Sequence, residues 1–328
     1  MMPNWSIALI PLLPLMAALW ISIGFIFDWN RGEKGEKETA RVSLFSIGIS
    51  FLLVIGLDIA AFMGELPQDI QLGTWLSSGK IQIHISFLLD TLSLTMATLI
   101  GFITLIVTKF SINYLHREAG FQRFFMMLSV FNAAMLLIVL AGNAALTFIA
   151  WELAGVSSFL LIAYSWHRDV ATGNAVRAFV TNRIGDIGFI LGIAFSFFWL
   201  GTVEWSEMSK VVKQDNISSL FVGIIIFGFM IAAFAKSAQF PFSAWITRAL
   251  EGPTPSSAVF YGSLMVHAGV YLLLRLEPLY VADSALLIII MLVGIITAAY
   301  GYIVGLVQTD VKSSFMFSTL AQVGLMLI

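Results

Sequence analysis

A lysine lies in the middle of an apolar stretch of this chain, and a proline follows it closely. Lys236 is flanked by the apolar runs 221–234 and 258–274. A lysine at the depth of a lipid bilayer costs about 2.5–3.5 kcal/mol, so it persists where it lines a polar pathway or pairs with an acid. Pro241 cannot donate a backbone hydrogen bond and interrupts a helix. These residues predict a broken helix whose free backbone groups line a wet cavity or bond to protein.

Glu152 is the acidic counterpart of this lysine in another apolar stretch. It lies in the sequence FIAWELAGVSS, whose glycine and serines indicate a packed or wet helix face. A carboxylate and an ammonium group at mid-membrane hold each other charged when they are close, and separating them lets the lysine release its proton. Glu152 and Lys236 are therefore predicted to form a proton switch. A static buried salt bridge is the alternative, and an inventory of charges does not separate the two.

Two pairs of further residues are candidates for proton transfer. Arg183 and Asp186 are three residues apart on one helical face, where pairing would serve the pathway or would simply ease insertion. His267 lies six residues beyond Tyr261 in one apolar stretch. A histidine binds and releases protons near neutral pH, whereas a tyrosine, with a reference pKa near 10, keeps its proton. For His267, packing against a neighbouring helix is the alternative role.

The composition fixes the class of protein. Hydrophobic residues make up 59% of the 328 residues and charged residues 11%, against about 45–50% and about 25% in soluble domains. The chain is predicted to be an all-α polytopic membrane protein that contacts lipid and no nucleic acid. It contains no cysteine, which excludes disulfides and thiolate metal sites. Its four histidines lack the spacing of metal ligands, so we predict no metal site.

Ten stretches are apolar and long enough to cross a bilayer or to begin crossing it. They are residues 5–27, 42–63, 85–108, 124–141, 144–166, 174–200, 218–251, 255–274, 284–307 and 311–328. A charged loop at 28–41, a polar excursion at 64–84 and a tight turn at Gly142-Asn143 separate some of them. Because the tenth stretch ends on apolar residues, we interpret the chain as part of a longer protein.

The basic residues divide unevenly between the two sides of the membrane. One set of alternating loops holds eleven of them: Arg31, Lys34, Lys37, Arg41, Lys109, Arg117, Arg123, Arg168, Arg177, Arg248 and Lys312. The opposite set holds four: Lys80, Lys210, Lys213 and Arg275. Because cytoplasmic loops carry the excess of lysine and arginine, the N-terminus is predicted to lie outside and the loop 28–41 in the cytoplasm.

Five short segments carry a family resemblance. In order they are Trp151-Glu152, TNRIGD at 181–186, AKSAQFP at 235–241, EGPTPSSA at 251–258 and VQTDVK at 307–312. Each segment alone is weak, but the ordered set resembles the antiporter-like proton-channel subunits of respiratory NADH-quinone oxidoreductase. The L-type subunit, called subunit 5 in mitochondria, is the most similar, and the resemblance covers residues 88–328.

The resemblance implies a division of the chain and a role for each matched residue. Residues 1–123 would be an N-terminal three-helix region, 124–277 the first antiporter-like repeat with helices 4–8, and 278–328 the start of an inverted second repeat. Glu152 and Lys236 would be the coupled pair of a proton half-channel, and Arg183 and Asp186 would modulate it. Lys312 would lie on the connecting proton path.

The chain departs from the family pattern at two positions of the eighth stretch. Tyr261 stands where the respiratory subunits usually have histidine, and His267 stands where they have threonine or another residue. The relay would then have moved along the helix by six residues, about 9 Å at 1.5 Å per residue. A divergent branch of the family is the other interpretation.

The resemblance also implies a working context. The chain would be a non-catalytic proton-translocating subunit in the bacterial cytoplasmic membrane, without a redox cofactor of its own, driven by the other subunits of a quinone-reducing respiratory complex. The same family supplies membrane subunits of inorganic-carbon uptake complexes and of multi-subunit Na⁺/H⁺ antiporters, so these functions, with Na⁺ as a possible ion, are the alternatives. A non-conducting scaffold is a third alternative, from a different class.

Overall fold

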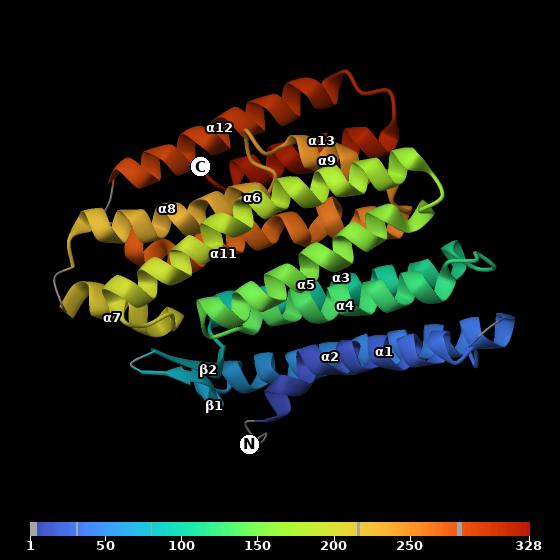
Figure 1. Cartoon of the computed structure of the whole chain (residues 1–328), viewed down its shortest axis with the longest axis horizontal. Coiled ribbons are helices and arrows are strands. Elements are labelled where there is room, and N and C mark those ends of the chain that lie inside the picture. The colour runs from blue at the N-terminus through green and yellow to red at the C-terminus, as the bar shows by residue number, and fades with distance from the viewer. Residues whose placement is uncertain (1–4, 31, 80, 215–216, 281–283) are drawn as a thin grey trace.

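The protein is a bundle of long helices with one small hairpin. The computed structural model describes residues 5–30, 32–79, 81–214, 217–280 and 284–328 (Figure 1). Within these residues, nine helices are long and apolar enough to cross a membrane. Two strands form the only sheet in the described part of the chain. The predicted all-α polytopic membrane fold is confirmed.

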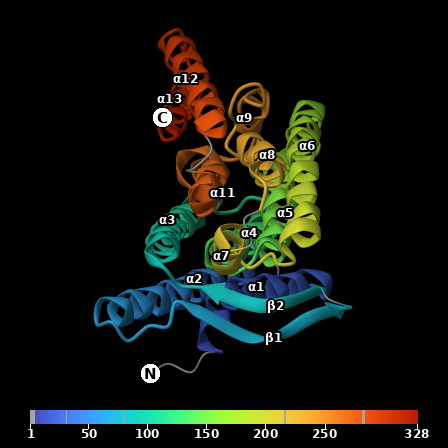
Figure 2. The same ribbon diagram turned by 90° about the vertical axis from the view of Figure 1, so that its left-hand side faces the viewer.

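Three helices and the hairpin build one edge of the bundle. Helix α1 spans Ser6–Ile26, α2 spans Gly32–Phe62 and α3 spans Thr91–Tyr114. Helices α1 and α2 pack on each other, and α1 and α3 both pack on α4. Figures 1 and 2 show α1, α2 and the hairpin at the edge opposite α12.

The predicted charged loop at 28–41 is mostly helical, so this prediction was wrong. Helix α2 starts at Gly32 and has 31 residues, about 47 Å at 1.5 Å per residue, which exceeds the ~30 Å hydrocarbon core. Its first turns alternate glutamate and lysine, which are good helix formers. They also contact the turn after α3, because Glu33 pairs with Arg117 at 2.8 Å and Glu36 contacts His116 at 2.9 Å.

The predicted polar excursion is a β-hairpin. Strand β1 spans Asp69–Ser78 and pairs antiparallel with β2, Ile81–Leu88. The third membrane helix therefore starts at Thr91 rather than at residue 85, with the Asp90 side chain accepting the Ser93 N–H at its N-cap. Alternating apolar residues at 81, 83, 85 and 87 carried this strand signal.

A buried polar cluster fastens the hairpin to the helices. Ser86 Oγ donates to Glu204 Oε2 at 2.6 Å, and Asn143 Nδ2 donates to Glu204 Oε1 at 3.1 Å. Asn143 also caps α5, because its Oδ1 accepts the Leu146 N–H. Burial raises the pKa of Glu204, although its two hydrogen bonds oppose this effect. The cluster joins β2, the turn before α5 and the segment after α6.

The middle of the chain forms the core of the bundle. Helix α4 spans Phe121–Leu140, α5 spans Ala144–Ile162 and continues as the 3₁₀-helix η1, Ala163–Ser165, and α6 spans Asp169–Leu200. The tight turn predicted at Gly142-Asn143 is confirmed. Helix α6 starts five residues before the predicted residue 174, and the predicted polar loop 201–217 contains a short helix, α7, Trp205–Gln214.

The predicted break in the seventh stretch is confirmed. Helix α8, Ser219–Lys236, ends at Lys236, and the chain resumes as α9, Ala244–Arg248, and the 3₁₀-helix η2, Ala249–Glu251. The end of α8 is a Schellman motif, in which the N–H of Gln239 bonds to the carbonyl of Phe234 at 2.9 Å. Ala238 takes the left-handed conformation of this motif, with φ of 54°.

Other elements bond to the backbone groups that the break leaves free. Trp245 Nε1 donates to the carbonyl of Ala235 at 2.8 Å. Thr297 Oγ1, from α12, accepts the N–H of Phe240 at 2.9 Å and donates to the carbonyl of Val293 at 2.8 Å. An unpaired backbone group at membrane depth costs several kcal/mol, so these two contacts allow the break to persist.

Helices α6 and α8 approach each other through small residues. A methyl group added at Gly188 would lie 2.6 Å from the carbonyl oxygen of Gly228, and one at Gly185 would lie 2.4 Å from Cβ of Ala235. Small residues let backbones come this close where lipid supplies no hydrophobic driving force between helices. The approach brings the last turn of α8 beside the middle of α6.

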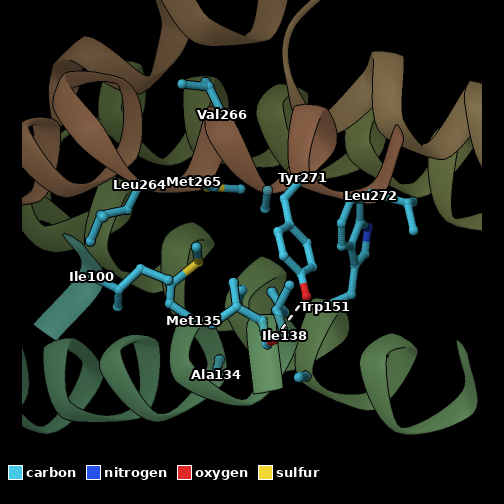
Figure 3. Close-up of a cluster of buried hydrophobic side chains, with 14 of the residues drawn as sticks. Ile100, Ala134, Met135, Ile138, Trp151, Leu264, Met265, Val266, Tyr271 and Leu272 are labelled. Carbon is cyan, nitrogen blue, oxygen red and sulfur yellow. Dashed lines mark hydrogen bonds between the residues drawn. The ribbon is translucent and has the colours of Figure 1, made fainter. Parts of the chain in front are cut away.

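The last quarter of the described chain completes the bundle. Its elements are α10, Thr254–Ser257, the π-helix η3, Ala258–Ser263, α11, Met265–Tyr280, α12, Ser284–Leu306, and α13, Val311–Leu325. The eighth predicted stretch is therefore helical but contains a π-helical turn. Helix α11 packs on α4, where the Tyr271 hydroxyl donates to the carbonyl of Val139 at 2.7 Å (Figure 3). Helix α13 begins at Val311, as predicted.

The buried Glu204 generates a pH prediction. Because the folded protein binds the proton of Glu204 more tightly than the unfolded chain does, this contribution to stability is complete below the unfolded pKa of about 4.3 and is lost as the pH rises through the folded pKa. The parent protein should therefore lose stability relative to Glu204→Gln on going from about pH 4.5 to about pH 7.5. Thermal unfolding midpoints in detergent test this, and equal pH slopes for both proteins would contradict it.

The contact at the helix break generates a second prediction. Thr297→Val keeps the shape of the side chain but leaves the N–H of Phe240 without its acceptor, at a cost of about 1–3 kcal/mol. We expect a lower thermal midpoint for Thr297→Val, and a midpoint near that of the parent for the control Thr297→Ser, which keeps the hydroxyl. Equal midpoints for the two variants would show that this bond contributes nothing.

Candidate functional site

Lys236 is buried where α8 breaks. Only 1% of its surface is exposed. Its Nζ donates to the carbonyl oxygen of Trp151 at 3.1 Å and lies 4.9 Å from the centroid of the Trp151 ring. The ammonium group is therefore held against α5 by a backbone dipole and by an aromatic face, two interactions that favour a cation.

Trp151 also contacts Asp186, a carboxylate of α6. Its indole Nε1 donates to Asp186 Oδ1 of α6 at 3.0 Å. Asp186 is 6% exposed. A single tryptophan thus contacts Lys236 through its backbone and its ring, and contacts Asp186 through its ring nitrogen.

Arg183 lies between two carboxylates. Its guanidinium forms an ion pair with Oε2 of Glu152 and lies 3.6 Å from Oδ2 of Asp186. The same group lies 4.4 Å from the ring centroid of Phe179. The Arg183 side chain is 37% exposed, against 21% for Glu152 and 9% for Asp186. Arg183 is therefore the more exposed of the two cations of the site.

The partner of Glu152 differs from the one that the sequence predicted. Glu152 pairs with Arg183, and no carboxylate oxygen of the described residues lies within 4.0 Å of Lys236 Nζ. The reason is that Lys236 faces the backbone of residue 151, whereas Glu152 projects toward Arg183 on α6. The coupling of Glu152 to Lys236 stays a prediction, and it would run through Arg183, Asp186 and Trp151.

The structure thus gathers four charged residues from three helices. Glu152 comes from α5, Arg183 and Asp186 come from α6, and Lys236 comes from α8. Two negative and two positive groups balance, which lowers the cost of burying them. We call these four residues the charge cluster. Sequence reasoning selected all four but missed the role of Trp151 as the common contact of Lys236 and Asp186.

The other predicted residues lie elsewhere. Lys312, in the first turn of α13, donates through Nζ to the carbonyl oxygens of Leu250 at 2.6 Å and Gly252 at 2.8 Å, which follow the helix break. His267 lies in the first turn of α11 and is partly buried. Tyr261 belongs to the π-helix η3, and its side chain lies outside the described residues.

The cluster is suited to proton transfer rather than to metal binding. No group of three or more His, Asp or Glu side chains in the described part of the chain is placed to hold a metal ion. A buried amine, a buried carboxylate and a partly buried carboxylate can each bind or release a proton, while an arginine keeps its charge. The fixed charge of Arg183 can therefore bias the protonation of the groups around it.

Two family models match the chain. The model described as NADH:quinone oxidoreductase/Mrp antiporter, TM, matches residues 141–328. The model described as NADH-Ubiquinone oxidoreductase (complex I), chain 5 N-terminus, matches residues 75–125. The first match includes the whole charge cluster.

Curated relatives are similar over nearly the whole chain. Subunit 5 of the chloroplastic NAD(P)H-quinone oxidoreductase of Citrus sinensis is 34% identical over 325 residues, which cover 98% of this chain and 44% of that protein. The corresponding protein of a Saccharum hybrid is 35% identical over 324 residues, with 97% and 44% covered. The chain therefore spans less than half the length of these relatives.

Two solved structures have the same fold. A chain of the Mrp complex from Dietzia sp. is 25% identical with a TM-score of 0.82, covering 97% of this chain and 33% of that chain. A chain of an archaeal membrane-bound sulfane sulfur reductase has a TM-score of 0.81, with 98% and 63% covered, and at 19% identity it shows the fold alone. With more than half of its residues matched by the first family model, this chain belongs to the NADH:quinone oxidoreductase/Mrp antiporter transmembrane family.

Proposed function

We propose that this chain translocates protons as a membrane subunit of an NADH-quinone oxidoreductase-type complex. The observation that carries the proposal is the charge cluster at the break of α8, where Lys236 is buried beside Asp186 and is linked through Trp151 and Arg183 to Glu152. Charged groups inside a membrane bundle mark ion and proton pathways by default. The chain itself performs no redox step in this proposal, and the other subunits supply the driving energy.

The geometry supports a mechanism in which Arg183 switches the cluster. In the structure Arg183 bonds to Glu152 and lies further from Asp186. If Arg183 moves toward Asp186, it neutralises the carboxylate that helps to hold the Lys236 ammonium group charged. The proton of Lys236 then leaves more readily. Return of Arg183 to Glu152 restores the field of Asp186 and favours uptake of the next proton.

The setting of the chain is part of the proposal. The distribution of lysine and arginine supports an N-terminus outside and the start of α2 in the cytoplasm. We place the protein in the bacterial cytoplasmic membrane, with other membrane subunits as partners and with residues 124–277 as the first repeat. The similarity to subunits of multi-subunit complexes supports such partners.

Ion exchange in an Mrp-type antiporter is the second candidate function. The structural similarity to a chain of the Dietzia Mrp complex favours it, because identity is 25% and the TM-score is 0.82 over 97% of this chain. Purification of the native complex separates the candidates. Flavin and iron–sulfur subunits would support the respiratory complex, whereas Na⁺-dependent proton movement without a redox partner would support the antiporter.

The first prediction from this proposal concerns Lys236. Lys236→Ala should insert normally, because it removes a cost of insertion, while proton translocation should fall on the order of 100-fold or more, as for loss of a positioned proton-transfer group. Proton uptake by vesicles that contain the assembled complex measures this. The matched control is Lys210→Ala, which changes an exposed lysine of α7 and should leave the rate unchanged. Near-normal translocation in Lys236→Ala would make Lys236 structural.

The second prediction concerns the ion pair of Glu152 and Arg183. Glu152→Gln and Arg183→Gln should each slow proton translocation, and the double variant should lose little more than either single one, because the residues act as a unit. The coupling free energy should lie within the range of about 0.5–3 kcal/mol for contacting residues. Four vesicle assays give the double-mutant cycle. If the fold-loss of the double variant equals the product of the two single fold-losses, the two residues act independently and the prediction is wrong. The control is Arg177→Gln, which changes an exposed arginine of α6.

A further inference from the structure

A small cavity lies between α5, α6 and α9, next to residues of the charge cluster. Gly155 and Ser158 line it from α5, Asn182 lines it from α6, and Trp245 lines it from α9. About 10 Å³ of it is open to the centre of a water molecule. This volume is at the lower limit for a cavity that holds one water.

The cavity contains a buried acceptor with no bond. Asn182 is 6% exposed, and its Nδ2 donates to the carbonyl of Ala178 at 2.9 Å. Its Oδ1 has no hydrogen-bond partner among the described residues. A buried acceptor without a hydrogen bond destabilises the folded protein, and a bridging water removes this penalty. The unpaired amide oxygen therefore indicates a ligand that donates a hydrogen bond.

A second polar group lines the same space. Ser158 is 5% exposed, and its hydroxyl donates to the carbonyl of Gly155 at 2.8 Å. Its oxygen lone pairs remain able to accept a hydrogen bond. A water between Asn182 and Ser158 therefore finds the two polar partners that a buried water needs at minimum.

Gly155 connects the cavity to Lys236. The Cβ of an alanine at this position would lie 3.7 Å from Lys236 Nζ. Because Gly155 also lines the cavity, the cavity and the amine both adjoin this glycine. Ser158 lies three residues beyond Gly155, toward the C-terminal end of α5, and Asn182 lies next to Arg183 and four residues before Asp186, toward the N-terminal end of α6. At that end Arg168 and Glu251 form an ion pair at 3.5 Å.

We propose that Asn182 and Ser158 hold a water molecule that exchanges protons with Lys236 on the side where α5 ends. The inference rests on the proposed function, because it assigns one step of the same pathway. In that step an N–H bond of the Lys236 ammonium group breaks as an O–H bond to the water forms, and the electron pair stays on nitrogen. The water gives another proton to water arriving from the end of α5, so the cavity keeps a neutral molecule. Asn182 is a positioning residue in this step.

Two substitutions of Asn182 separate a water site from a structural role. Asn182→Leu has nearly the same size, fills the space with apolar atoms and removes the acceptor. Asn182→Ala removes the same acceptor and the same bond to Ala178, but leaves room for additional water. We expect proton translocation to fall on the order of tenfold in Asn182→Leu, less than for loss of the proton-carrying group itself. The loss in Asn182→Ala should be smaller, because additional water in the enlarged cavity can replace part of the lost acceptor.

The experiment uses the assembled complex in vesicles, with Lys236→Ala measured beside the two variants. Equal rates for Asn182→Leu, Asn182→Ala and the parent would overturn the water site, and so would equal losses in the two variants, which would make Asn182 structural. If Lys236→Ala also translocates normally, the proposed function itself has failed, and this result is distinct from a failure of the water site alone.

A structural measurement keeps the test decisive if Asn182→Leu does not assemble. A map of the parent complex that resolves waters elsewhere in the bundle should contain a water within hydrogen-bonding distance of Asn182 Oδ1 and Ser158 Oγ. An empty cavity in such a map would overturn the proposal. Gly155→Ala offers a third variant. Its methyl group would occupy part of the cavity wall at 3.7 Å from Lys236 Nζ, so it should slow translocation as Asn182→Leu does.

Discussion

The burial of one ammonium group governs the architecture of this protein. Lys236 is almost completely enclosed, and a cation inside a membrane bundle needs partners that replace its water. The carbonyl and ring of Trp151 supply the nearest ones, and Asp186 is held beside them by the indole of the same residue. The positions of α5 and α6 relative to α8 follow from these contacts. Arg183 then balances the second carboxylate, Glu152, which would otherwise leave the site with excess negative charge.

The helix break is the structural counterpart of this burial. Ending α8 at Lys236 frees backbone groups, and the protein satisfies them with a Schellman motif, with Trp245 and with Thr297 of α12. Lys312 of α13 binds carbonyls on the far side of the break. Helix α12 therefore contacts the break itself, and α13 contacts the chain that follows it.

Much of this could be predicted from the sequence, and the errors have physical causes. Charged residues in apolar stretches identified the four members of the charge cluster, because burial of charge is too costly to be accidental. Their pairing was not predictable, since which acid faces Lys236 depends on how α5 and α6 rotate against α8. The hairpin was missed because its strand alternation was read as the edge of a membrane span, and Glu204 was missed because its partners, Ser86 and Asn143, lie in two other segments of the chain. The start of α2 was missed because the charged residues of 28–41 were taken to indicate a loop, although they also favour a helix that extends beyond the membrane.

The spacing of residues on α5 and α6 explains why the cluster and the cavity are neighbours. Trp151, Gly155 and Ser158 follow one another at four and three residues along α5, so they share one helix face. Asn182 and Asp186 are four residues apart on the facing side of α6. Each face therefore presents a bulky or charged group beside Lys236 and a small or neutral polar group one turn further along. This pattern leaves space and polar acceptors for a water molecule next to the charge cluster.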